Sequence, residues 1–363
     1  MATRIAVTSG YYSQNIGNAF FQLGGRALIE RAAPEADVFF VPDSPGNWTL
    51  WRKSSGRPRA SLDIIQWYDP DLLVLQGPTL RRGFDEMWAS TFEELKARGT
   101  RVLLLGIGLF RFDSHERSLV RDLADSGLVA GACARDEVTH QVLTDAGIES
   151  VSGLDSAFFL PWAYQPNSLD GSPHYVVVNF DRFPEPRISA RTDEPSAGLG
   201  ATSAGYALPD ATIMVRPAAR VLGRLAGFGH VASYAGQALR RRRTNDSVGP
   251  YTIVRTSNRA NPPLHRLNYR HPNSFVADEP FSYLDLLANA ELVMADRVHS
   301  CVAAAAYGRP SWFLGDTPRA GLLDQVNAEP PVDGKLVPKP GLLEERRETQ
   351  CEWLHQLLSD LAD

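Results

Sequence analysis

The chain has 363 residues and a formal net charge of −5, and with 44% hydrophobic and 22% charged residues it has the composition of a globular protein. The acidic balance argues against nucleic acid as a partner, and no apolar run is long enough to span a bilayer. The three cysteines have neither the number nor the spacing of a disulfide framework or a metal site, and residues 1–3 lead straight into an apolar run, so we expect a cytoplasmic protein without a signal peptide.

The first half of the chain alternates short apolar runs with helical patterns. The runs lie at residues 5–7, 38–41, 72–75, 102–105 and 128–130, and the helical patterns at 19–31, 83–98, 117–125 and 136–146. Short continuous apolar runs predict strands buried on both faces, and helices between them predict a parallel sheet. Because 363 residues exceed the usual size of one domain, we expect a first Rossmann-like domain at 1–162.

A polar stretch with several prolines, 161–173, separates this unit from a second one. Apolar runs resume at 175–179, 251–254, 292–294 and 311–314. We therefore expect a second Rossmann-like domain at 174–340, and a helix at 341–363 that packs back on the first domain. The predicted fold class is α/β, with two Rossmann-like domains that face a cleft.

Residues 188–249 interrupt the pattern of the second domain. Their second part carries seven arginines and no acidic residue between Asp210 and Asp246. Apolar residues at roughly helical spacing accompany these arginines, which is typical of a basic amphipathic segment that touches an anionic membrane surface or a lipid phosphate. The alternative is a solvated insertion. Residues 216–243 are thus a candidate for peripheral contact with the inner face of a membrane.

The most informative stretch is 290–310. It opens with an apolar segment that predicts a buried strand, and a helix of small residues follows and ends at Gly308. Arg297 and His299 therefore lie where a parallel strand meets a helix N-terminus, which is where anionic ligands bind in open α/β sheets. A guanidinium beside an imidazole suits a phosphate or a carboxylate together with a proton transfer.

Three further motifs accompany this one at predicted strand ends. They are Asn15-Ile16-Gly17-Asn18-Ala19, Gly106-Ile107-Gly108, and Ala134-Arg135-Asp136 followed by Leu154-Asp155-Ser156. Together the four motifs resemble the polysaccharide pyruvyl transferase family, over both halves of the chain except 188–249. The resemblance implies an architecture similar to that of the GT-B-like glycosyltransferases. It also implies transfer of a pyruvyl group from phosphoenolpyruvate to hydroxyls of a saccharide, which forms a ketal.

The chain departs from the family pattern at three positions. The first loop usually carries Gly-Asp, and an aspartate there can act as a base, whereas the asparagine of Gly17-Asn18 cannot. Pro78 stands in a turn that is usually rich in glycine, and it lacks a backbone N–H. Ser300 follows the Arg-x-His motif, where glycine is usual. A catalytically silent family member that binds a glycan or a partner enzyme is therefore an open alternative.

The resemblance implies that Arg297 and His299 act at the donor. Phosphoenolpyruvate carries a phosphate and a carboxylate, so its site needs two cationic anchors. Arg297 is expected to be the first anchor, helped by the N–H of Ser300 at the helix start. Arg255 and Arg319 are candidates for the second, in that order, because both follow strands of the same domain.

A protonated His299 is expected to act as the general acid that delivers a proton to the donor. Asp155 is either a base or an interdomain contact, and Arg135 is expected to be structural. The residues expected to bind substrate from the first domain are Asn15, Gly17 and Asn18. The reaction requires neither a metal nor a cofactor, and no cluster of His, Asp and Glu has the spacing of metal ligands.

The leading hypothesis is thus a pyruvyl transferase with phosphoenolpyruvate as donor and a saccharide or lipid-linked saccharide as acceptor. The competing hypothesis is a GT-B-like glycosyltransferase with a nucleotide-sugar donor, in which Glu279 or Asp316 would contact the ribose. A homo-oligomer is compatible with both hypotheses.

Overall fold

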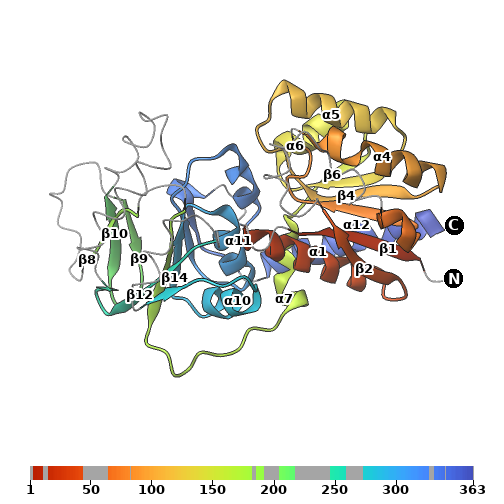
Figure 1. Cartoon of the computed structure of the whole chain (residues 1–363). Helices are drawn as coiled ribbons and strands as arrows, with labels where there is room; N and C mark the ends of the chain where they lie inside the picture. Colours follow the sequence, from red (N-terminus) through yellow and green to blue (C-terminus); the bar gives the residue numbers. More distant parts are fainter. Residues whose placement is uncertain are drawn as a thin grey trace, which may run out of the picture.

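The structure of the chain, a computed structural model, describes residues 3–10, 15–43, 64–81, 83–181, 185–191, 204–216, 246–258, 273–326, 331–339 and 341–362. These residues form two α/β domains that lie side by side, each built on its own β-sheet (Figure 1). The two chain termini lie together, at the end of the first domain that is remote from the second (Figure 1). The predicted α/β fold class is confirmed.

The first domain is built on a parallel sheet with the strand order β2-β1-β3-β4-β5-β6. Its strands are β1 (Arg4–Ser9), β2 (Asp37–Pro42), β3 (Leu72–Gln76), β4 (Arg101–Ile107), β5 (Val129–Ala134) and β6 (Ser150–Ser152). Its helices are α1 (Gly17–Ala32), η1 (Ile64–Tyr68), α4 (Phe84–Ala97), α5 (Ser114–Asp125) and α6 (Glu137–Asp145). Strand β3 is buried throughout, which explains its continuous apolar run, since helices cover both faces of such a sheet.

The chain crosses to the second domain through η2 (Ser156–Phe159) and α7 (Leu160–Ala163). The second sheet has the order β11-β12-β7-β14-β15-β16, with β13 beside β12. Its strands are β7 (Tyr175–Asn179), β11 (Ser247–Val248), β12 (Tyr251–Thr256), β13 (Ser274–Phe275), β14 (Leu292–Ala295), β15 (Ser311–Phe313) and β16 (Lys335–Leu336). Its helices are α10 (Phe281–Ala288), α11 (Val298–Ala306), η5 (Pro318–Gln325) and η6 (Val332–Gly334).

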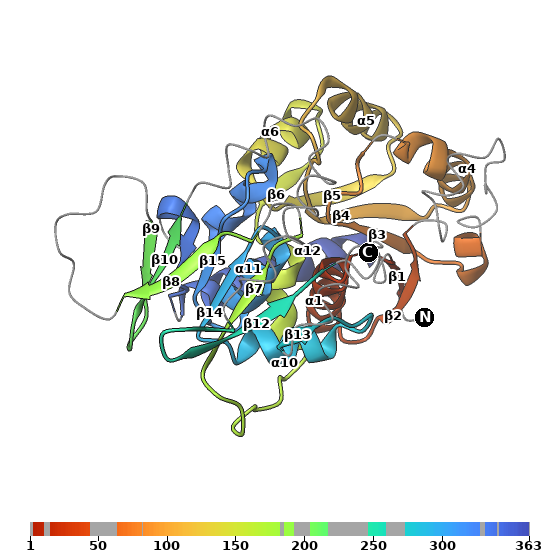
Figure 2. The ribbon, with the colours of Figure 1, turned by 60° about the vertical axis from the view of Figure 1, so that its left-hand side comes forward.

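Part of the region 188–249 is a sheet, which the sequence analysis did not predict. The strands β8 (Arg187–Arg191), β9 (Ala204–Ala207) and β10 (Thr212–Arg216) pair antiparallel in the order β8-β10-β9. Ile213 and Val215 alternate along β10 and pack in one buried cluster with Trp312 of the second sheet. The three strands lie at the end of the molecule remote from the termini (Figure 2). Residues 217–243 lie outside the described residues, so the membrane contact through 216–243 stays a prediction.

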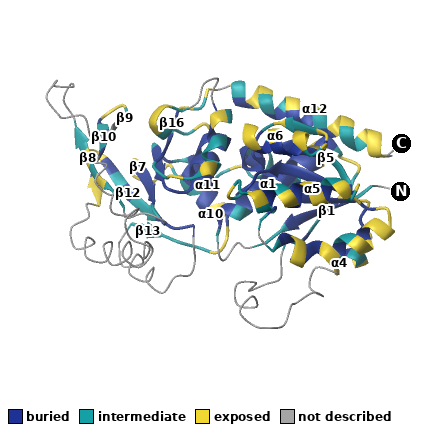
Figure 3. Ribbon diagram, turned by 90° about the horizontal axis from the view of Figure 1, so that it is seen from above, coloured by how far each residue is buried: buried dark blue, intermediate teal, exposed yellow. Residues whose placement is uncertain are grey.

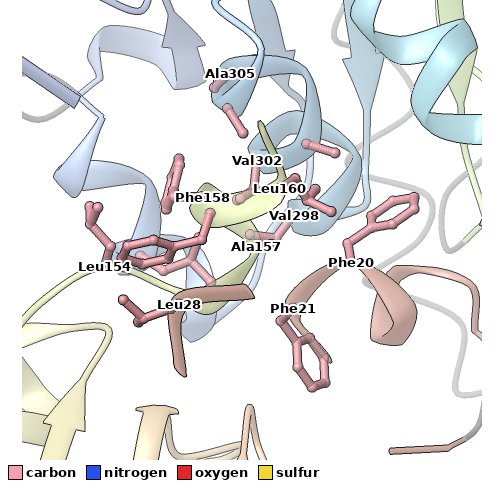
Figure 4. Close-up of a cluster of buried hydrophobic side chains, with 14 of the residues drawn as sticks. Phe20, Phe21, Leu28, Leu154, Ala157, Phe158, Leu160, Val298, Val302 and Ala305 are labelled. Carbon is pink, nitrogen blue, oxygen red and sulfur yellow. The ribbon is translucent and has the colours of Figure 1, made fainter. Parts of the chain in front are cut away.

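One buried apolar cluster joins the two domains (Figure 4). Phe20 and Leu28 of α1 and Phe158 of η2 meet Val298 and Val302 of α11 in this cluster. Helix α11 is buried along its whole length, and its small side chains allow this close approach. The domains are therefore joined along α1, η2 and α11 by a shared core.

The C-terminal helix α12 (Leu342–Ala362) returns to the first domain and lies against α1. Arg31 of α1 pairs with Glu348 at 2.6 Å, and Nδ1 of His355 lies 2.8 Å from the carbonyl oxygen of Ala32. Leu354 of α12 is fully buried. Helix α12 thus follows the second domain in sequence but packs on the first domain.

Burial follows the layers of the fold (Figure 3). Strands β3, β7 and β14, at the centres of the two sheets, are buried throughout, whereas α4, α5 and α12 present exposed residues on their outer faces (Figure 3). In the part of the chain that the structure describes, no helix is both long enough and apolar enough to cross a membrane.

Candidate functional site at the domain boundary

Polar side chains gather where the strands of both sheets end at their carboxyl edges. In the second sheet the register places Asn179 of β7 opposite Thr256 of β12 and Ala295 of β14, so the residues that follow these three strands meet. Two groups result. The His299 cluster consists of Arg135, Asp155, His299 and Arg319, and the Arg297 cluster consists of Asn179, Asp181, Asn258, Arg297 and Ser300.

His299 lies in the first turn of α11, directly after β14. The imidazole is contacted from the first domain by Phe21, whose ring centroid is 5.2 Å away. Gly17, the first residue of α1, lies against the histidine as well: a Cβ at Gly17 would be 3.2 Å from Cβ of His299 and 3.2 Å from Nδ2 of Asn258. A side chain at position 17 would press on both residues, because the two domains approach closely there.

Arg135 and Asp155 hold the imidazole from the first domain. Nη1 of Arg135 donates to Oδ2 of Asp155 at 2.8 Å, and Nε2 of His299 lies 3.4 Å from the same oxygen. Asp155 is 0% exposed, Arg135 1% and His299 9%. Gly108, after β4, makes room for this arrangement, since a Cβ there would collide with Nε of Arg135. Asp155 thus contacts His299 across the domain boundary, and its role as a base stays a prediction.

The charges of the cluster set the protonation of both groups. Burial by itself would raise the pKa of Asp155, but the charges of His299 and Arg135 and the hydrogen bonds from His299 and the N–H of Ala157 outweigh it and hold that pKa well below its usual range. Burial lowers the pKa of His299, and Arg135 and Arg319 lower it further, against the opposing effect of Asp155. Asp155 is therefore ionised, and His299 is mainly neutral at pH 7.

Arg319 brings a second positive charge to His299 from η5 of the second domain. Its guanidinium carbon lies 4.8 Å from the ring centroid of Phe110, a residue of the first domain. The loop that carries Phe110 is held by the buried carboxylate of Glu116, which accepts hydrogen bonds from the N–H of Phe110 at 3.0 Å and of Arg111 at 2.8 Å. Arg319 is only half-buried.

Arg297 turns toward the strands of its own domain. Its Nε donates to Oδ2 of Asp181 at 3.0 Å, and Asp181 also accepts from Oγ of Ser257 at 2.6 Å and from the N–H of Asn258 at 2.9 Å. Arg297 as a whole is 7% exposed. Its Nη2 is buried and has no hydrogen-bond partner among the described residues. Arg297 thus has one nitrogen bound to a structural carboxylate and one buried nitrogen without a hydrogen-bond partner among the described residues.

Ser300 is engaged within the second domain. Its hydroxyl accepts from Nδ2 of Asn179 at 3.1 Å and donates to Oδ1 of Asn258 at 3.2 Å, and its N–H donates to the carbonyl oxygen of Arg297 at 3.2 Å. The N–H that was expected to bind the donor therefore already has a partner, because the first turn of α11 closes on itself. We leave Ser300 out of the proposed donor site.

Arg255 is paired away from the His299 cluster. Its Nε and Nη2 donate to the two carboxylate oxygens of Glu185 at 2.9 and 3.0 Å, and its Nη1 lies 3.7 Å from Oδ1 of Asp246. A bidentate pair of this kind occupies the same nitrogens that would bind a donor anion. Both candidates for the second anchor, Arg255 and Arg319, stay predictions, and the nitrogens of Arg255 are already engaged by Glu185.

The first loop of the chain lies at the same boundary. The N–H of Ile16 donates to the carbonyl oxygen of Asn258 at 2.8 Å, which ties the start of α1 to the second domain. Nδ2 of Asn15 donates to Oδ1 of Asn18 at 2.9 Å. The three predicted substrate residues Asn15, Gly17 and Asn18 are thus beside the Arg297 and His299 clusters.

Sequence reasoning missed Asp181 and Phe110 and gave Arg135 only a structural role. All three follow a strand of a parallel sheet by one to three residues: β7, β4 and β5 respectively. Ligand-binding residues concentrate at such strand ends. Applying the rule to every strand, rather than to the Arg-x-His motif first, would have found them.

Other chemistries find less support in the described part of the chain. There, no group of three or more His, Cys, Asp or Glu side chains is placed to hold a metal ion. Burial raises the pKa of the Cys301 thiol to about 12, so it is protonated at neutral pH. The carboxylate of Glu279 accepts from the N–H of Phe281 at 2.8 Å and of Ser282 at 3.0 Å, so it caps α10 instead of facing a ribose.

A comparison with protein families gives one match. The family model described as "Polysaccharide pyruvyl transferase" matches residues 15–317. The match takes in Arg135, Asp155 and His299 and stops two residues short of Arg319. No curated protein matches the sequence.

Solved structures of low sequence identity share the fold. The S. aureus MnaA protein, solved with UDP, is 12% identical, with a TM-score of 0.51 over 99% of this chain and 91% of its own. The UDP-N-acetylglucosamine 2-epimerase of Rickettsia bellii is 10% identical, with a TM-score of 0.50 over 100% of this chain and 96% of its own. The likeness confirms the expected GT-B-like architecture of two Rossmann-like domains.

Proposed function

Since the chain belongs to the polysaccharide pyruvyl transferase family, we propose that it transfers a pyruvyl group from phosphoenolpyruvate to two hydroxyls of a saccharide, forming a cyclic ketal and releasing phosphate. The observation that carries the proposal is the His299 cluster, in which a carboxylate and a guanidinium of one domain meet an imidazole and a guanidinium of the other. The family implies a polysaccharide as the acceptor.

The reaction needs one proton donor and a way to neutralise two acidic groups. A proton is added to the methylene carbon of the donor, which gives the neighbouring carbon positive character. One saccharide hydroxyl attacks that carbon and loses its proton to the group that acted as acid. The second hydroxyl then displaces the phosphate, which leaves with the second proton, and the ring of the ketal closes.

His299 is the general acid of this scheme. When the Nε2 proton points to Asp155, Nδ1 is the nitrogen that remains for the substrate; among the described residues it makes no hydrogen bond. The imidazole is mainly neutral in the free protein, because burial and two arginines lower its pKa. The negative charges of the donor oppose that effect and raise the pKa, so donor binding and protonation of His299 are coupled.

Two arginines of the second domain bind the acidic groups of the donor. Arg319 is half-buried and close enough to His299 to lower its pKa. Arg297 offers Nη2, while Asp181 keeps its Nε in place. A guanidinium binds a phosphate or a carboxylate in a defined direction, which orients the methylene carbon toward the imidazole.

A direct assay tests the proposal. The protein is incubated with phosphoenolpyruvate and a panel of free and lipid-linked glycans, and phosphate release and product mass are followed. We expect phosphate release that depends on the glycan and a product heavier than the acceptor by pyruvate minus water. A sugar-sized gain with a nucleotide sugar would instead support the competing glycosyltransferase, and protection by glycan without turnover would support a silent family member.

A further inference from the structure

We infer that the C-terminal helix α12 positions Asp155, His299 and Arg319 relative to one another, with Arg347 as the main positioning residue. Helix α12 lies outside residues 15–317, to which the family match is confined. The effect on turnover rests on the proposed function, whereas the effect on the geometry of the His299 cluster does not.

Arg347 joins the two segments that carry the carboxylate and the imidazole. It is buried, its Nε donates to the carbonyl oxygen of Phe158 at 2.7 Å, and its Nη2 donates to the carbonyl oxygen of Ala306 at 2.7 Å. Phe158 lies in η2, three residues after Asp155, and Ala306 is the last residue of α11, the helix that begins beside His299. Because the guanidinium is planar and rigid, its two bonds fix the distance between the segments.

Two neighbours of Arg347 on α12 reach the same region. Oε1 of Gln350 accepts from the N–H of Leu154 at 2.7 Å, immediately before Asp155. Nη1 of Arg346 donates to the carbonyl oxygen of Gln325, and it lies 3.1 Å from Oε1 of the same residue. Gln325 ends η5, the segment that carries Arg319. The side chains of Arg346, Arg347 and Gln350 on α12 thus bind the three segments that carry Asp155, His299 and Arg319.

The helix is itself anchored to the first domain, so it provides a fixed reference. The Arg31–Glu348 pair and the contact of His355 with Ala32 hold it against α1. Leu357 packs at Gly131 of β5, the strand that leads to Arg135: a Cβ on that glycine would lie 3.1 Å from Cδ2 of Leu357. Helix α12 therefore also contacts the strand that leads to Arg135, the remaining member of the His299 cluster.

The contact between His299 and Asp155, which depends on the bonds of Arg347, is long for a hydrogen bond. Nε2 of His299 lies 3.4 Å from Oδ2 of Asp155, near the outer limit of a hydrogen bond. A small shift of η2 against α11 is enough to break it. Loss of the Arg347 bonds should therefore separate the two groups and change the pKa of His299.

The test compares three variants of the full chain. Arg347→Met keeps the unbranched stem of the side chain without its donors, and Arg347→Lys restores one charged donor. Gln356→Met is the matched control, because it breaks a hydrogen bond of the same helix that joins only two exposed residues, Gln356 and Asp360. The pKa of His299 is measured by NMR of labelled histidine, with His299→Asn to assign the signal, and kcat and KM for phosphoenolpyruvate are measured in parallel.

We expect Arg347→Met to shift the pKa of His299 by about half a unit or more and to lower kcat on the order of 10- to 100-fold with a smaller change in KM. Arg347→Lys should recover part of both effects, and Gln356→Met should change neither. A folded Arg347→Met variant with the pKa and kcat of the wild type would overturn the inference.

A second variant keeps the inference testable if Arg347→Met does not fold. Arg346 is only partly buried, and Arg346→Met should raise KM for phosphoenolpyruvate several-fold by releasing η5 and with it Arg319. An unchanged KM would count against the inference. If the wild type shows no pyruvyl transfer but Arg347→Met still shifts the histidine pKa, the proposed function fails and the positioning role stands.

Discussion

The His299 cluster and the Arg297 cluster lie side by side at the domain boundary, yet they are built differently. The Arg297 cluster lies within the second domain. The carboxylate of Asp181 accepts hydrogen bonds there from Ser257, Asn258 and Arg297. The His299 cluster has members in both domains, and its carboxylate faces two groups that carry or can take up positive charge. The first arrangement joins loops of one domain, whereas the second joins charged groups of both domains.

The contrast shows that an arginine and a histidine two residues apart in sequence can bind different partners in the structure. Side chains two residues apart at the start of a helix point in different directions. Arg297 therefore reaches Asp181, and His299 reaches Asp155 across the boundary. The charge that accompanies the histidine comes instead from Arg135 and Arg319, which are distant in sequence.

Removing the imidazole should have the largest effect on activity. We expect His299→Asn to lower kcat by about 10²- to 10⁴-fold, the usual contribution of a proton donor, because the rest of the cluster consists of two arginines and an ionised aspartate, none of which donates a proton readily at neutral pH. Phosphate release measures turnover, and calorimetry should show that phosphoenolpyruvate still binds. A variant that turned over at the rate of the wild type would remove His299 from the mechanism.

Replacing Arg297 should lower the free energy of unfolding. Arg297→Met leaves the buried Asp181 carboxylate without its charged partner, which costs about 3–5 kcal/mol of unfolding free energy for a buried pair. Urea denaturation measures the loss. The double variant with Asp181→Asn should recover much of it, since the uncompensated charge is then gone, and additive losses would show that the pair is not coupled.

Arg319 should affect donor binding with little effect on stability. Loss of a hydrogen bond to a charged group costs about 1.5–3 kcal/mol, so we expect Arg319→Met to raise KM for phosphoenolpyruvate roughly 10- to 100-fold. The unfolding free energy should change little because the side chain is half-buried over Phe110. If Arg297→Met raised KM and Arg319→Met did not, Arg297 alone would anchor the donor.

The pH dependence offers the smallest and most specific test. The proton donor is the imidazolium of His299, whose pKa in the free protein lies below its ordinary value, and kcat/KM reports the free protein. We therefore expect kcat/KM to rise as pH falls from 8 to about 6, by at most about tenfold per pH unit. Arg319→Met removes a charge that lowers this pKa, so the same limb should move to higher pH. A shift to lower pH would contradict the assignment.

Local sequence determined the elements and several strand ends. The continuous apolar run of β3 and the small residues of α11 are recognisable because both elements are buried on all sides, and burial selects apolar or small side chains wherever the partner lies. The same logic located Arg297 and His299 at a strand end. It missed β8, β9 and β10, because these strands pack on one face only and lack the burial on both faces that selects continuous apolar runs.

Only the tertiary structure decided which charges meet. Arg135, Asp155, His299 and Arg319 lie in four separate segments, and their contacts depend on how two sheets and α12 are placed against each other. No periodicity encodes such a contact, because hydrogen bonds and ion pairs depend on tenths of an ångström between groups far apart in sequence. The sequence alone thus determined that a polar site exists at these strand ends. The packing of the domains decided that Arg255 pairs with Glu185, and that the charge of Arg319 lies near enough to lower the pKa of His299.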